Sequence, residues 1–164
     1  MGIYLNPGNN NFSETIRADV YVDKTMLISA INRCIDSGNK YICMSRPRRF
    51  GKTIAGNMLS AYYSKGCDSY ELFKHFKIAR TPEFENKLNK YNVIKLDMNS
   101  EYQNTLDKEK LIWRVTEEIK EEMRAAFPDV AIKDDDSLAQ CILRIYTATN
   151  ETFIIIIDEY DVLV

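Results

Sequence analysis

The chain has 164 residues, of which 45% are hydrophobic, 11% aromatic and 28% charged, and its formal net charge is −2. These values are typical of one globular domain with a buried core, and the aromatic content excludes a disordered chain. The charge is uneven, because residues 1–82 carry 12 Lys/Arg and 6 Asp/Glu whereas residues 83–164 carry 10 and 18. A generally basic nucleic-acid-binding surface is excluded, but a local basic site is not.

No segment of the sequence predicts a membrane span or a secretion signal. The most apolar run, Phe153–Ile157, has five residues, whereas a membrane-spanning helix needs about 20. The first residues lack the basic and apolar regions of a signal peptide. The four cysteines are scattered and there is one histidine, a composition that argues against a zinc site and for reduced thiols. We therefore expect a cytoplasmic protein with no membrane partner.

In the first half of the chain, the pattern predicts two helices that flank a short strand. Apolar residues recur at helical spacing after Asp23, which we expect to act as the N-cap. The apolar run that follows is short enough for a buried strand, and the next loop is rich in Arg, Pro and Gly. The predicted elements are an irregular lead-in over 1–22, a helix that follows Asp23 and is closed by Gly38, a strand over Tyr41–Met44, a loop over 45–51 and a helix from Lys52 to about Ser64.

In the second half, two strands alternate with two helices. The longest predicted helix has an apolar face and a face of glutamates (residues 117, 118, 121 and 122), which we expect to be solvated. The predicted elements are a strand over Tyr91–Met98, a helix over 107–126, a helix capped by Ser137 and a strand over Phe153–Ile157. Strands that alternate with helices predict an α/β fold with a mostly parallel sheet.

The order strand, loop, Gly51-Lys52-Thr53, helix is typical of a phosphate-binding loop, the Walker A motif. The N-terminus of a helix offers unpaired backbone N–H groups and the positive end of the helix dipole. Glycine lets the backbone approach phosphate oxygens, lysine reaches the β- and γ-phosphates, and the threonine hydroxyl can bind Mg²⁺. We therefore predict that Gly51, Lys52 and Thr53 bind ATP, with Thr53 also a ligand of Mg²⁺.

The rest of this loop departs from the glycine-rich pattern. Arg46 stands where the full pattern has a glycine, and Pro47 follows it. A side chain at this position resists a positive φ, so the turn differs or the phosphates bind less tightly. Arg48 and Arg49 have three alternative roles: contact with phosphate, pairing with acidic residues, or nucleic-acid binding. The predicted nucleotide-binding loop comprises Arg46, Pro47, Arg48, Arg49, Phe50, Gly51, Lys52 and Thr53.

The run Phe153–Ile157 followed by Asp158 and Glu159 is a Walker B pattern. In this pattern a buried strand delivers an aspartate to the Mg²⁺ shell, so Asp158 is the second predicted metal ligand. The adjacent Glu159 holds the position that polarises the attacking water in P-loop ATPases. A general base must lie within reach of that water, and a strand end beside the phosphate loop meets this requirement. We predict that Glu159 and Lys52 are the catalytic residues.

Three stretches together resemble the bacterial AAA-ATPase-like family. They are Tyr21-Val22-Asp23-Lys24-Thr25, the specific SRPRRFGKT stretch over 45–53, and Ile157-Asp158-Glu159-Tyr160-Asp161, and the opening residues 2–8 match as well. The resemblance spans the whole chain, and it implies that Arg46 in place of glycine is normal in the family. It also implies that a nuclease-like domain often follows in the intact protein.

The resemblance implies a P-loop NTPase fold, a three-layer sandwich with strand order 5-1-4-3-2. Strands 1, 2 and 3 would be Tyr41–Met44, Tyr91–Met98 and Phe153–Ile157, whereas strands 4 and 5, the sensor residue and the arginine finger would be missing. We therefore expect one incomplete domain, with residues 1–39 as the lead-in segment and helix and residues 40–164 as the core from Walker A to Walker B.

The function implied is Mg²⁺-dependent ATP hydrolysis in the intact protein. This chain alone is expected to aggregate readily and to be a weak or inactive ATPase. Two alternatives remain at this stage: a nucleotide-binding switch with little hydrolysis, and a nucleic-acid-associated module whose arginines meet a phosphate backbone. The oligomeric state and the process that hydrolysis would drive do not follow from the sequence.

Overall fold

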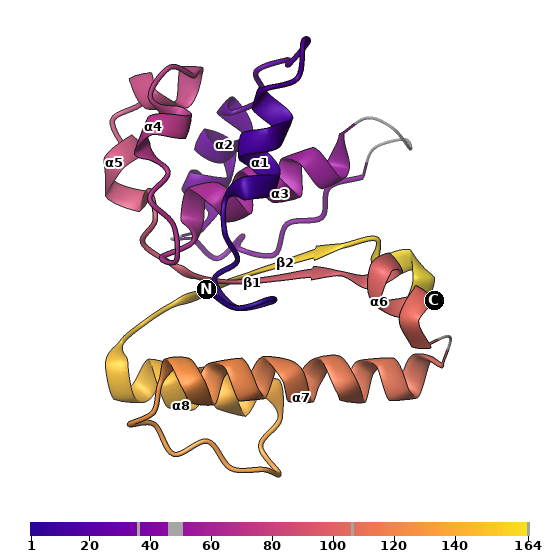
Figure 1. Cartoon of the computed structure of the whole chain (residues 1–164). Helices are drawn as coiled ribbons and strands as arrows, with labels where there is room; N and C mark the ends of the chain where they lie inside the picture. Colours follow the sequence, from indigo (N-terminus) through magenta and orange to yellow (C-terminus); the bar gives the residue numbers. More distant parts are fainter. Residues whose placement is uncertain (36, 46–50, 106, 164) are drawn as a thin grey trace. The chain divides into compact units, whose positions relative to one another are not determined.

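The computed structural model describes residues 1–35, 37–45, 51–105 and 107–163 (Figure 1). The chain forms two compact units, Met1–Pro7 with Tyr91–Val164 and Gly8–Lys90, and each is described by itself. Among the described residues, no helix combines the length and apolarity that a membrane span requires. The elements are α1 (Asn10–Ile16), α2 (Met26–Ile35), α3 (Lys52–Tyr63), α4 (Tyr70–Phe73), the 3₁₀ helix η1 (Lys77–Arg80), α5 (Phe84–Lys87), β1 (Asn92–Asp97), α6 (Met98–Thr105), α7 (Lys108–Ala126), α8 (Leu138–Thr149), β2 (Phe153–Asp158) and the 3₁₀ helix η2 (Tyr160–Leu163).

The unit that contains both described strands is built on a parallel pair, β1 and β2. Their register runs from Asn92 opposite Phe153 to Asp97 opposite Asp158. On the other side of β1, Leu5 forms an antiparallel bridge with Ile94. The predicted α/β class and the parallel pairing are confirmed, because strands distant in sequence pair in parallel through a helical crossover. Within the described residues, the other edge of β2 has no strand beside it.

Helices α7 and α8 lie side by side in this unit and supply its core (Figure 1). Their predicted positions are confirmed, and the Ser137 side chain with Gln140 forms a capping box at the start of α8. The apolar face of α7 is almost fully buried, except that Ile112 is 52% exposed. The buried residues of this face are Leu111, Val115, Ile119 and Met123.

The glutamate face of α7 is not simply solvated, which corrects the sequence-based expectation. The Glu122 carboxylate accepts backbone N–H groups from Ile3 at 2.6 Å, Tyr4 at 3.1 Å and Leu5 at 2.7 Å. The Tyr4 hydroxyl donates to Glu118 at 2.7 Å. These partners lie more than 110 residues earlier in the chain, so the helical periodicity of α7 could not reveal them.

The second unit contains α1, α2, α3, α4, η1 and α5 around an aromatic core. The Phe12 ring stacks on Phe73 with centroids 5.0 Å apart, and Tyr62 meets Phe73 edge-on at 5.4 Å. Phe12 belongs to α1, so the lead-in predicted as irregular contains a helix. Asn89 fixes the C-terminal end of α3, since its Nδ2 donates to the carbonyls of Ala61 and Ser64. These hydrogen bonds hold α3 in place at its C-terminal end, and Lys52 lies at the other end of the helix.

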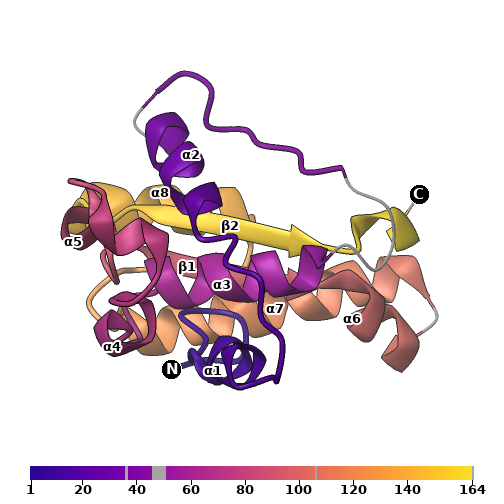
Figure 2. The same ribbon diagram turned by 90° about the horizontal axis from the view of Figure 1, so that it is seen from above.

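The strand predicted over Tyr41–Met44 is wrong. These residues are described, yet they form neither a strand nor a helix, and they run as an extended stretch after α2 (Figure 2). Tyr41 is 90% exposed and Ile42 is 50% exposed, so the run is not buried either. The tendency of apolar residues to form strands depends on how their side chains pack against neighbouring strands. An apolar run that meets no partner strand therefore stays unpaired.

Candidate functional site

The predicted phosphate-binding tripeptide occupies the start of α3. Gly51 is the N-cap residue and has φ +76° and ψ +33°, a left-handed conformation that favours glycine. Lys52 is the first residue of α3 and is partly exposed, and Thr53 follows it on the exposed surface. The first backbone N–H groups of α3 have no acceptor within the helix, so this end of α3 favours an anion.

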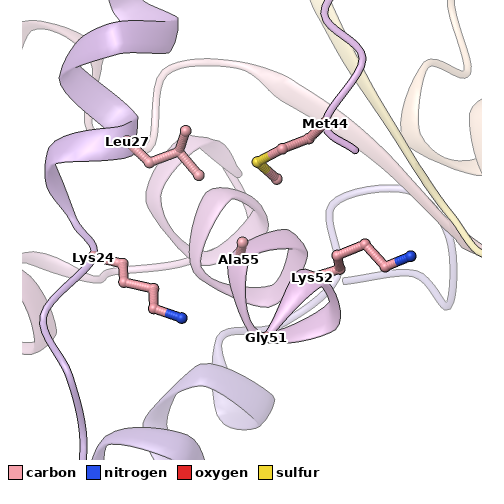
Figure 3. Close-up of a pocket in the computed structure, with 6 residues that line it drawn as sticks. All are labelled: Lys24, Leu27, Met44, Gly51, Lys52 and Ala55. Carbon is pink, nitrogen blue, oxygen red and sulfur yellow. The ribbon is translucent and has the colours of Figure 1, made fainter. Parts of the chain in front are cut away.

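A pocket of about 290 Å³ lies against this end of α3. Figure 3 shows Leu27 and Met44 pointing toward each other over Ala55, while Lys24 and Lys52 flank the first turn of the helix. Gly51 completes the lining. The pocket thus combines an apolar side with two ammonium groups and the positive end of a helix dipole, a combination that suits an amphiphilic anion such as a nucleotide.

The other loop residues predicted to bind nucleotide fall outside the described residues. They are Arg46, Pro47, Arg48, Arg49 and Phe50. Their assignment to the phosphate loop stays a prediction. The nucleic-acid alternative depends on the same arginines, so it also stays a prediction.

The Walker B aspartate lies at the end of β2, in the other unit. Asp158 Oδ1 accepts the backbone N–H of Glu159 at 3.0 Å. Asp158 Oδ2 is buried, and no hydrogen-bond partner for it exists among the described residues. A buried carboxylate oxygen without a donor is costly unless a proton or a cation meets it. Asp158 therefore fits Mg²⁺, a hard cation that takes one or two protein carboxylates together with water and substrate phosphates.

Glu159 follows Asp158 with φ +54°. A non-glycine residue in this left-handed region carries steric strain, and such strain concentrates at functional sites. The Glu159 side chain is partly exposed, as a residue that meets a water molecule must be. Within the described parts of the chain, no group of three or more His, Cys, Asp or Glu side chains could hold a metal by itself. The other ligands of a metal at Asp158 would therefore be of another kind, such as a hydroxyl group, water or substrate.

Comparison with known proteins gives one match. A family model described as a predicted AAA-ATPase matches residues 7–164. The chain belongs to this AAA-ATPase-like family. No curated protein and no solved structure matches the chain significantly. Membership supports a nucleotide-dependent, ATPase-like role in general terms, and the two motifs that suggested the family lie at the start of α3 and at the end of β2.

Two neighbours of Asp158 in this AAA-ATPase-like chain were missed from the sequence. Asp97 ends β1 directly opposite Asp158 and accepts hydrogen bonds from the Ser100 N–H and hydroxyl. Lys95 lies two residues earlier on the same face of β1. Burial lowers the pKa of Lys95, although the charges of Asp158 and Asp97 partly oppose that shift. The available signal was a carboxylate at the end of an apolar strand, the same signal that identified Asp158.

Lys24 was also missed as a pocket residue. It lies in the Tyr21–Thr25 stretch that helped to identify the AAA-ATPase-like family, yet its spacing from Gly51 in the sequence gives no sign of proximity. The structure brings Lys24 and Gly51 together within one unit. Gly51, Lys52 and Thr53 belong to that unit, whereas Asp158 and Glu159 belong to the other.

Proposed function

We propose that this chain binds ATP with Mg²⁺ and that the intact protein hydrolyses the bound nucleotide. The observation that carries the proposal is the placement of Gly51-Lys52-Thr53: a left-handed glycine, then a lysine and a threonine that open α3 beside a pocket. Family membership supports the same conclusion. The strand order 5-1-4-3-2 belongs to this proposal: β1 and β2 would be its neighbouring strands 2 and 3, whereas Tyr41–Met44, expected as strand 1, forms no strand.

Each residue of the candidate site has a proposed role that follows from the chemistry of its side chain. Lys52 and the first N–H groups of α3 would bind the terminal phosphates and stabilise the charge that develops during their transfer. Thr53 and Asp158 would hold Mg²⁺, which when bound neutralises charge on the phosphate oxygens. Glu159 would orient a water molecule and accept its proton as the water attacks the terminal phosphorus, while the bond from that phosphorus to the bridging oxygen breaks and ADP leaves. Arg46, Pro47, Arg48, Arg49 and Phe50 would complete the loop around the phosphates.

The test is titration of the purified chain with Mg·ATP by isothermal calorimetry, with wild type compared to Lys52→Ala. Loss of the lysine is expected to weaken ATP binding by about tenfold or more, because a hydrogen bond to a charged phosphate contributes roughly 1.5–3 kcal/mol. Lys65→Ala is the matched control. Lys65 lies beyond the other end of α3, whose 12 residues span about 18 Å at 1.5 Å per residue.

Two results would contradict the proposed function. One is a wild-type chain that binds neither Mg·ATP nor Mg·ADP at millimolar concentration. The other is a folded Lys52→Ala variant that binds ATP as tightly as wild type. Far-UV circular dichroism shows whether the variant is folded.

A further inference from the structure

Lys24 lies against the first turn of α3. A Cβ atom placed on Gly51 would lie 3.3 Å from the Lys24 Nζ, so the ammonium group is close to the backbone of the phosphate loop. Lys24 lines the same pocket as Lys52, and in Figure 3 the two side chains lie on opposite sides of Gly51. Two cations from separate elements therefore flank the positive end of the α3 dipole, and this arrangement concentrates positive potential in the pocket.

The backbone around Lys24 is fixed on both sides by hydrogen bonds. Asp23 Oδ1 accepts from the Thr25 N–H at 2.8 Å and the Thr25 hydroxyl at 2.6 Å, and Asp23 Oδ2 accepts from the Lys77 N–H at 3.0 Å. Thr25 is fully buried, and its hydroxyl accepts from the Ile78 N–H at 3.3 Å. The Lys24 carbonyl accepts from the Leu27 N–H at 3.0 Å, at the start of α2. Lys24 is therefore held in position while its side chain stays exposed.

The two sides of the pocket differ in polarity. Leu27, three residues after Lys24, points into it together with Met44, and Ala55 lies beneath them (Figure 3). These apolar side chains suit the flat, apolar faces of a nucleotide base. Lys52 lies on the far side of Gly51 and, under the proposed function, reaches the terminal phosphates. Lys24 and Leu27 come from the same short stretch, and this shared origin is the reason to assign Lys24, rather than Lys52, to the base side of the pocket.

From this geometry we infer that Lys24 is a second nucleotide-binding residue, which contacts the phosphate next to the nucleoside and serves binding rather than turnover. This inference rests on the proposed function. ADP and ATP share the phosphate next to the nucleoside, so loss of Lys24 weakens both ligands by the same factor. Loss of Lys52, which contacts the terminal phosphates, weakens ATP more than ADP.

The experiment measures the affinities of wild type, Lys24→Met and Lys24→Arg for Mg·ADP and Mg·ATP by calorimetry. Lys24→Met is expected to weaken both ligands about tenfold, the size expected for a charge-assisted contact with phosphate. Lys24→Arg keeps the charge and is expected to stay within about threefold of wild type. Lys65→Met removes the same charge at the other end of α3 and is the matched control. Thermal melting shows whether the variants fold like wild type.

Three outcomes overturn the inference while wild type still binds both nucleotides: a folded Lys24→Met variant with unchanged affinity, a loss confined to ATP, or an equal loss in Lys65→Met. In each of these cases the proposed function stands. If wild type binds neither nucleotide, the proposed function fails and the inference fails with it.

Discussion

Glu159 combines a strained backbone conformation with a side chain that can act as a base. Its left-handed φ of +54° is costly for a side chain with a Cβ, by roughly 1–2 kcal/mol relative to the right-handed region. A glycine or asparagine would relieve that cost, so a glutamate at this position needs another explanation. The proposed role as general base supplies one, because the strained turn directly follows Asp158, which has a buried oxygen that meets no hydrogen-bond partner in the part of the chain that the structure describes.

Replacement of Glu159 by glutamine tests this role. The amide keeps the size and the turn but cannot accept a proton at neutral pH, so ATP binding is expected to be unchanged and hydrolysis about 100-fold slower or more. Single-turnover hydrolysis of radiolabelled ATP by the intact protein in excess measures the rate, and calorimetry measures binding. Glu121→Gln, an exposed position on α7, is the matched control. Equal rates in wild type and Glu159→Gln would place the base elsewhere.

Among the elements, the start of α2 shows how an acidic residue can stabilise a helix without capping it. Asp23 was expected to be the N-cap of this helix. Instead, its carboxylate accepts hydrogen bonds from Thr25, which precedes the first residue of α2, and from the backbone N–H of Lys77, the first residue of η1. It therefore joins the start of α2 to η1. Burial by itself raises the pKa of Asp23, but the hydrogen bonds from Thr25 and Lys77 outweigh burial and lower the pKa below its ordinary value of 3.8.

The lowered pKa of Asp23 predicts a pH-dependent effect of Asp23→Asn. At neutral pH the variant is expected to lose about 1 kcal/mol of unfolding free energy, a modest value because the carboxylate is only partly buried. The stabilisation by the carboxylate is complete above 3.8 and is lost as the pH falls through the lower pKa of the folded state. Urea unfolding from neutral pH to about pH 2 should therefore show the difference between wild type and variant shrinking.

Asp19→Asn is the control for this experiment, because Asp19 is exposed and its substitution removes the same charge a few residues earlier. A difference between wild type and Asp23→Asn that stays constant across the pH range would show that the carboxylate charge does not carry the stabilisation.

At the scale of the whole molecule, one unit is closed by the first residues of the sequence, which contact a helix and a strand that lie far along the chain. Residues 3–5 are held on α7 by Glu122 and Glu118 while Leu5 pairs with β1. Gly2 allows this close approach, since a side chain there would collide with the Glu122 carboxylate. The N-terminal segment thus covers one edge of the sheet, and covered edges resist pairing with other chains.

Glu122→Ala is expected to release this segment. The substitution leaves three backbone N–H groups without their acceptor, so we expect a loss of about 2 kcal/mol in unfolding free energy and more self-association through the uncovered edge of β1. Urea unfolding measures the first effect and size-exclusion chromatography the second. Glu121→Ala, one residue earlier and exposed, should change neither. Equal stability of the two variants would show that the contact of residues 3–5 with α7 is energetically unimportant.

The sequence by itself determined the features that depend on short-range interactions. Helical periodicity predicted α2, α7 and α8, the expected cap at Ser137 predicted the start of α8, and the motif Gly51-Lys52-Thr53 was predicted to open the helix that is α3. Each of these follows from hydrogen bonds or packing within a few residues, so local spacing encodes it. Family membership also followed, because its motifs are contiguous.

Only the tertiary structure decided which distant residues meet. It left Tyr41–Met44 without a partner strand, joined Glu122 to residues 3–5, set Asp97 opposite Asp158, and brought Lys24 to Gly51. In each of these cases, the role of a residue depends on a neighbour that is distant in the sequence. Since local patterns carry no record of that neighbour, the sequence predicted the two motifs of the candidate site but not the residues that surround them.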